Sequence, residues 1–218
     1  MNKYGIYPPQ RGPEEVRAFA YHEAGHAVAA IALGLRITSV QMRERKVRGR
    51  TAAATVCIFE AWKRKEFGQH VRFEFAKLAV TYLFAGYEAQ RLVDSYLFST
   101  LAADDDITQA AYLLHEAKLF PDGRPKYIRG CKKLGDEAYW RWLDKRQKEA
   151  RRVVRWEKAA IAAVAREFMR RNAKEFSHEE IEAIVEPLLT EKSLNFREKI
   201  DSARCFDELR PSQSNPAL

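Results

Sequence analysis

The chain has 218 residues, of which 46% are hydrophobic, and a mass of 25.2 kDa. This length suits a single domain with a substantial core, and the composition excludes a wholly disordered or fibrous protein. The excess of 38 basic over 30 acidic residues gives a formal net charge of +8, which permits an anionic partner without requiring one.

Neither a membrane segment nor a disulfide framework is predicted. The longest uncharged apolar run, residues 27–33, is far shorter than the roughly 20 residues of a membrane span, and the N-terminus lacks the apolar stretch of a secretory signal. Cys57, Cys131 and Cys205 are too few and too far apart to form a disulfide framework. We therefore expect a cytoplasmic protein with reduced thiols.

The N-terminal part of the chain predicts an extended arm, a helix and a hairpin. Residues 1–13 contain several Pro, Gly and Tyr residues and are expected to form the arm. Apolar residues then recur at helical spacing until Gly34, which predicts a helix at about 14–33. Alternating and β-branched residues on either side of Gly49 predict a β-hairpin over residues 37–59.

The middle of the chain predicts helices separated by a loop. Residues 60–68 are expected to begin a helix, and residues 71–93 are apolar on nearly all sides, as in a buried core helix. Another helix is expected to start at the acidic residues 104–106, and Pro and Gly residues predict a loop over 119–135. A long helix is predicted over 136–172.

The C-terminal part predicts one more helix and a tail. Ser177 and Glu180 form a capping-box pattern, which begins a short helix that ends at about residue 189. Residues 190–218 are expected to be a mostly flexible tail. The predicted fold class is therefore mainly α, with a small β-hairpin or sheet after the first helix.

One pentapeptide, His22-Glu23-Ala24-Gly25-His26, forms an H-E-x-x-H pattern inside the first predicted helix. Residues four apart lie one turn above each other, so both imidazoles can bind the same metal ion. Glu23 lies about 100° around the helix, where its carboxylate suits a general base rather than a metal ligand. Two histidines merely packed on an apolar face are the alternative. Gly25 favours a site, because glycine in a helix interior costs roughly 1 kcal/mol relative to alanine.

A catalytic zinc ion normally has three protein ligands and one open position, so a third ligand is required. The metzincin continuation of the motif is absent, because Ala29 and Ala32 stand where that pattern has Gly and His. Spacing along the chain leaves several candidates open: His70, Glu88, Asp94, the triplet Asp104 to Asp106, His115 and Glu116.

Basic residues are concentrated in two places, which permits binding of nucleic acid or another acidic partner. The first group lies on or beside the predicted hairpin: Arg36, Arg43, Arg45, Lys46, Arg48 and Arg50. The second lies on the long predicted helix, where Trp140, Trp142 and Trp156 are interleaved: Arg141, Lys145, Arg146, Lys148, Arg151, Arg152, Arg155 and Lys158. An ordinary solvated helix face is favoured, because Asp144, Glu149 and Glu157 dilute the charge of this second group.

With these motifs the chain resembles the peptidase domain of the FtsH-type zinc metalloproteases, AAA+ enzymes that degrade proteins at membranes. Residues 20–30, which contain the H-E-x-x-H pattern, are close to the zinc-binding helix of that family. In the family's order, residues 83–90 (LFAGYEAQ) are similar to its L-A-G-R-A-A-E-E helix, and residues 102–110 (AADDDITQA) to its G-A-x-x-D-L-x-x-A segment. The resemblance covers about residues 14–189.

The resemblance implies both a site and a domain arrangement. Asp106 would be the third zinc ligand beside His22 and His26, and Glu23 the catalytic residue. Residues 14–135 would form a compact helical zinc-peptidase core, with the C-terminal helices of 136–189 packed on it.

The chain also departs from the family. Tyr87, Gln90 and Arg91 replace the arginine and paired glutamates of the middle motif, and no G-x-x-x-x-G-K-[ST] phosphate loop occurs. We therefore expect an ATP-independent zinc metallopeptidase acting on peptides or unfolded proteins, with substrate extended along an edge strand near residues 51–58. Folded substrates would require a separate ATPase or regulatory partner. The alternative is a non-catalytic regulatory or nucleic-acid-binding protein that uses a zinc-bound peptidase-like fold.

Overall fold

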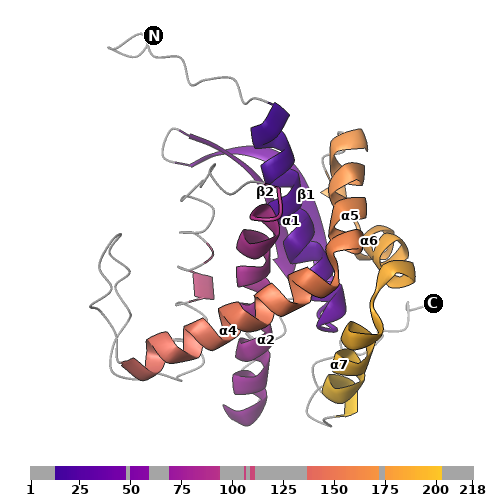
Figure 1. Ribbon diagram of the computed structural model, residues 1–218. Coiled ribbons are helices and arrows are strands. Elements are labelled where there is room, and N and C mark those ends of the chain that lie inside the picture. The colour runs from indigo at the N-terminus through magenta and orange to yellow at the C-terminus, as the bar shows by residue number, and fades with distance from the viewer. Residues whose placement is uncertain are drawn as a thin grey trace, which may run out of the picture.

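Helices dominate the part of the chain that the structure describes, as the apolar periodicity predicts (Figure 1). The computed structural model describes residues 13–47, 50–58, 69–93, 106, 109–110, 137–171 and 175–202. None of the helices in these ranges is long and apolar enough to cross a membrane. The elements, in chain order, are α1 (Pro13–Ala32), β1 (Ile37–Val47), β2 (Arg50–Ile58), α2 (Gln69–Gln90), α4 (Glu137–Trp156), α5 (Lys158–Arg171), β3 (Glu175–Phe176), α6 (His178–Val185), the 3₁₀ helix η2 (Glu186–Leu188) and α7 (Glu191–Ser202).

The central element is α1, which is buried on nearly all sides. From Ala18 to Leu33, every side chain is buried except that of Tyr21, which is partly exposed. Alanine at many of these positions keeps the helix narrow, so α2, α5 and the strands pack closely against it. Figure 1 shows α1 between α2 and α5, with β1 and β2 behind it. The core therefore forms around the helix that carries the H-E-x-x-H pattern.

The sheet has three antiparallel strands in the order β2-β1-β3. β1 and β2 form the predicted hairpin, with Ile37 opposite Ile58 and Val47 opposite Arg50. The sequence does not predict β3, where Phe176 pairs with Val40, because a two-residue strand carries no detectable period. Since β1 is the middle strand, β2 has an edge without a strand partner in the described sheet.

The chain bends at Glu157, so the prediction of one long helix over 136–172 is wrong: α4 and α5 meet at this residue. Backbone hydrogen bonds nevertheless continue across the bend. The N–H of Glu157 donates to the carbonyl of Val153, and the N–H of Ile161 donates to the carbonyl of Glu157, each at 2.9 Å. The side chain of Glu157 is fully buried at the bend and contacts α7.

Helix α7 lies within the segment 190–218 that the sequence places in a mostly flexible tail, so the structure differs from the prediction here. The Thr190 hydroxyl, the Thr190 N–H and the Ser193 hydroxyl donate to Glu157 Oε1 at 2.6, 3.2 and 2.5 Å. A carboxylate at this place satisfies N–H groups at the start of a helix and interacts favourably with its dipole. The stabilising partner of α7 is 33 residues away in the chain, beyond the reach of local patterns.

The predicted capping box at the start of α6 is confirmed. The Glu180 N–H donates to Ser177 Oγ at 3.2 Å, and the Ser177 N–H donates to the Glu180 carboxylate at 2.9 Å. Several other predictions lie outside the described residues: the arm up to residue 12, the helix start at 60–68, the acidic residues 104 and 105, the loop over 119–135 and the tail beyond 202.

Candidate metal centre

The two histidines of the H-E-x-x-H pattern present their side chains to the same point. His22 and His26 lie one turn apart on α1, and their Nε2 atoms are 3.1 Å from each other. The ring planes meet at 85°, and both side chains are buried. The helix therefore places two nitrogens together, as their spacing predicts.

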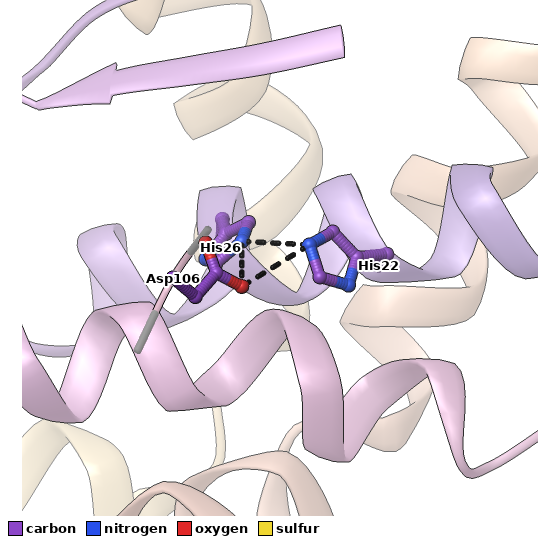
Figure 2. A group of neighbouring side chains, drawn as sticks. All are labelled: His22, His26 and Asp106. Atoms are coloured by element: carbon purple, nitrogen blue, oxygen red, sulfur yellow. Dashed lines mark hydrogen bonds and ion pairs between the residues drawn. The ribbon is translucent and has the colours of Figure 1, made fainter. Parts of the chain in front are cut away.

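Asp106 joins these histidines in a group of three (Figure 2). Its Oδ2 atom lies 3.3 Å from His22 Nε2 and 3.4 Å from His26 Nε2. The backbone at Asp106 is helical, and the side chain is buried. Among the candidates for a third ligand, this is the carboxylate that the described part of the chain brings to the two imidazoles.

A backbone contact from α2 sets the orientation of the His26 ring. His26 Nδ1 lies 3.0 Å from the carbonyl oxygen of Tyr82. Because a carbonyl oxygen only accepts hydrogen bonds, Nδ1 carries the proton and donates it. In the neutral ring, Nε2 then presents its lone pair to His22 and Asp106. Such a hydrogen bond is the usual partner of a metal-binding histidine.

Two glycines allow α1 and α2 to approach closely enough for this contact. A Cβ atom on Gly86 would lie 2.3 Å from His26 Nε2 and 2.6 Å from Cε1, so the imidazole packs directly on the backbone of α2. A Cβ on Gly25 would lie 2.4 Å from Ala89 Cβ and 2.6 Å from the Ala85 carbonyl oxygen. The packing requirement predicted for Gly25 is thus met at the helix crossing.

The electrostatics of the group favour a cation beside Asp106. Burial lowers the pKa of His26, but the charge and polar contact of Asp106, with a smaller contribution from Glu23, outweigh burial and raise the pKa to about 9. Burial raises the pKa of Asp106, whereas the charge of His26 and the contacts with both imidazoles lower it to about 2. Without a metal, the pair therefore binds a proton tightly.

The donor set fits a metal ion. Two imidazole nitrogens and one carboxylate oxygen, all from buried residues, lie within 4.8 Å of one another. Asp106 Oδ2 has no hydrogen-bond partner among the described residues. Atoms that carry lone pairs repel one another at these distances unless a proton or a metal cation compensates them. Imidazole and carboxylate groups bind divalent transition metals, so His22, His26 and Asp106 can hold such an ion.

Glu23 lies beside this group without belonging to it. It follows His22 on α1, so its side chain leaves the helix about 100° further round. It is 4% exposed, and its charge acts on the His26 ring. A buried carboxylate adjacent to a metal-binding group can accept and donate a proton there.

Glu88, another candidate ligand, has a different role. Its carboxylate, buried on α2, accepts two hydrogen bonds from the Arg151 guanidinium and one from Gln147, all at 2.9 Å. It therefore joins α2 to α4. Asp94, Asp104, Asp105, His115 and Glu116 lie outside the described residues, and so does the side chain of His70.

Neither protein-family models nor curated proteins gave a match to this chain. The geometry of the site thus carries the functional argument.

Of the two groups that hold His26, sequence reasoning missed one and identified the other only as a mark of a close helix crossing. The Tyr82 carbonyl belongs to the backbone and carries no residue signature. Gly86 stands out as a glycine inside a buried helix, but only the structure places His26 against it.

Proposed function

We propose that this protein is a zinc-dependent metallopeptidase that hydrolyses peptide bonds in peptides or unfolded proteins. The observation that carries the proposal is the convergence of His22, His26 and Asp106 at ligand distance, with Glu23 buried next to them. Two imidazoles, one carboxylate and an open position are the ligand set of many catalytic zinc ions. The resemblance of the motifs to FtsH-type peptidases supports the same assignment.

Two imidazoles and one carboxylate suit zinc, and the same donor set also serves non-haem iron. The buried carboxylate of Glu23 beside the group favours a hydrolytic zinc site, because hydrolysis needs a group that accepts a proton from water.

Glu23 distinguishes hydrolysis from simple metal storage. A zinc ion held by His22, His26 and Asp106 would acidify a water molecule and polarise a substrate carbonyl. The Glu23 carboxylate accepts the proton that the attacking water loses and donates it to the leaving amine. The Tyr82 carbonyl holds the His26 ring in place throughout, since its hydrogen bond involves only Nδ1.

The edge of β2 suits a substrate that binds in an extended conformation. This strand pairs with β1 on one side only in the described sheet, and β2 contacts α1, the helix with both histidines. A peptide can add to such an edge through backbone hydrogen bonds, which make few demands on sequence. Peptides and unfolded chains offer free backbone, so they are the expected substrates. A separate ATPase or regulatory partner would extend the activity to folded proteins.

Metal analysis and the variant Glu23→Gln test the proposal together. We expect about one zinc ion per chain in the wild-type protein and in Glu23→Gln, because Glu23 is outside the ligand group. Hydrolysis of unfolded casein should fall at least 100-fold in Glu23→Gln, since general acid–base catalysis contributes that much or more. Equal turnover by the two proteins would contradict the catalytic assignment.

A ligand variant separates the metal from the chemistry. Asp106→Asn keeps the shape of the side chain but removes its charge, so zinc affinity should fall at least tenfold. Zinc bound by the wild type without hydrolysis of any unfolded substrate would instead indicate a non-catalytic regulatory protein.

A further inference from the structure

The outer face of α4 carries a row of cations that the metal centre does not use. Five exposed basic residues follow one another at intervals of four and three residues: Arg141, Lys145, Lys148, Arg152 and Arg155. On a helix of 3.6 residues per turn they fall within about 80° of arc, and they extend over about 21 Å. We call these five residues the α4 basic stripe.

The stripe points directly away from the core. Leu143, Ala150, Val153 and Val154 are buried on the opposite side of α4. The two basic residues outside the stripe are engaged within the protein: Arg151 binds Glu88, and Arg146 binds Glu149 at 2.7 Å. The long helix thus divides its cations between internal ion pairs and the solvent side.

The acidic residues that dilute the charge in the sequence do not neutralise the stripe. Glu157 is fully buried and bound to α7, and Glu149 pairs with Arg146. Among the described residues, Asp144 pairs with Lys148 at 2.6 Å, and Arg141 has an interaction of its own within the protein. Lys145, Arg152 and Arg155 remain on this helix face as three exposed cations without an ion-pair partner in the described part of the chain. An ordinary solvated face mixes both signs more evenly.

We propose that the α4 basic stripe binds the phosphate backbone of nucleic acid. A straight, regular row of cations is complementary to a regular row of phosphates. Lys145, Arg152 and Arg155 are exposed and have no ion-pair partner within the described part of the chain, so they are available to phosphates without breaking an internal pair.

A membrane surface fits the stripe less well. A helix that binds membranes also inserts an apolar face, but the apolar face of α4 is in the core. The exposed large hydrophobic residues of the described chain all lie outside α4.

Recognition would be independent of sequence. Of the three interleaved tryptophans, Trp140 and Trp142 pack against the core, and Arg146 lies over the Trp142 ring. Lys192 of α7 lies over the ring of the third, Trp156. Contacts to phosphates alone position a protein on nucleic acid without identifying bases. The stripe should therefore bind duplexes of different sequence with similar affinity.

The test uses the full-length protein and a labelled 20-base-pair duplex, with binding followed by fluorescence anisotropy at 50 to 200 mM salt. The variant replaces Lys145, Arg152 and Arg155 with glutamine. We expect at least tenfold weaker binding at 50 mM salt, and a slope of log affinity against log salt that falls in magnitude by about two to three.

A matched control removes the same charge elsewhere. It replaces three exposed cations on α1, α5 and α7 with glutamine: Arg17, Arg166 and Lys192. This control should retain wild-type affinity within about twofold, and both triple variants should keep their zinc. No wild-type binding at 50 mM salt, or an equal loss in both variants, would overturn the proposal. So would polyglutamate or phosphatidylserine vesicles that bind the stripe more tightly than the duplex does.

Discussion

The His26 ring donates a hydrogen bond to the Tyr82 carbonyl and packs on the backbone of α2 at Gly86. The Tyr82 carbonyl fixes Nδ1 at 3.0 Å, and Gly86, one turn further along α2, leaves room for the ring. Two positions on one face of α2 thus determine the direction of Nε2. The orientation of the His26 ring therefore depends on α2 as much as on α1, the helix that carries the residue.

This arrangement predicts that Gly86→Ala weakens metal binding. The new Cβ would overlap the imidazole, with 2.3 Å to Nε2, so the ring must turn away from Asp106. We expect zinc affinity to fall by about 10- to 100-fold, as when the orienting partners of a metal ligand are lost. Competition with a chromophoric chelator measures this affinity.

A double-mutant cycle distinguishes ring displacement from general damage. Gly86→Ala should lower the unfolding free energy of the metal-free protein by about 1–3 kcal/mol. In a His26→Ala background the clash is absent, so most of this loss should disappear. Gly25→Ala, which meets Ala85 and Ala89 instead, should cost the same with or without His26. An unchanged zinc affinity in Gly86→Ala would show that the ring does not depend on this space.

At the scale of elements, buried carboxylates join helices that are distant in the sequence. Glu88 holds α4 against α2 through Arg151 and Gln147. Glu157 binds the start of α7. Each carboxylate is buried and accepts hydrogen bonds from a neighbouring element, which is the condition under which a buried charge is tolerated.

The contact between Glu157 and α7 predicts a specific loss of stability. Glu157→Gln keeps the side-chain volume but removes the charge that accepts from Thr190 and Ser193, so the unfolding free energy should fall by about 1.5–3 kcal/mol. Denaturation with urea measures this change. The same substitution at Glu198, exposed on α7, should stay within about 0.5 kcal/mol of wild type. Similar values for both variants would remove Glu157 from the anchoring of α7.

The elements differ in how far the sequence predicts them. Helices α1, α2 and α6 follow from apolar periodicity and local caps, because each depends on residues within a few positions. The bend at Glu157 and the helix α7 depend on partners 33 and 36 residues apart. The third member of the metal group could likewise be named only through a family resemblance, since spacing does not show which distant carboxylate returns to α1.

For the molecule as a whole, the metal group makes the stability of the metal-free protein depend on pH. The folded-state pKa of His26, about 9, exceeds its usual 6.5, so the stabilising proton is fully bound below pH 6.5 and is lost as pH rises to about 9. The folded-state pKa of Asp106, about 2, is below its usual 3.8, so its contribution is complete above pH 3.8 and is lost as pH falls toward 2.

We therefore expect the metal-free protein to lose up to about 3 kcal/mol of unfolding free energy between pH 6.5 and 9. Chemical denaturation in the presence of a chelator measures this loss. In Asp106→Asn the charge that raises the His26 pKa is absent, so the loss should be much smaller. A wild-type protein with flat stability over this range would contradict the pairing of His26 with Asp106.

The position of Glu157 also affects the order in which parts of the chain can fold during synthesis. The ribosome makes this residue before Thr190 and Ser193, so its carboxylate lacks these hydrogen-bond donors until they have been synthesised. The bend between α4 and α5 cannot reach its final state until the beginning of α7 has left the exit tunnel. Completion of the interior therefore depends on a segment that is translated after helices α1 to α6.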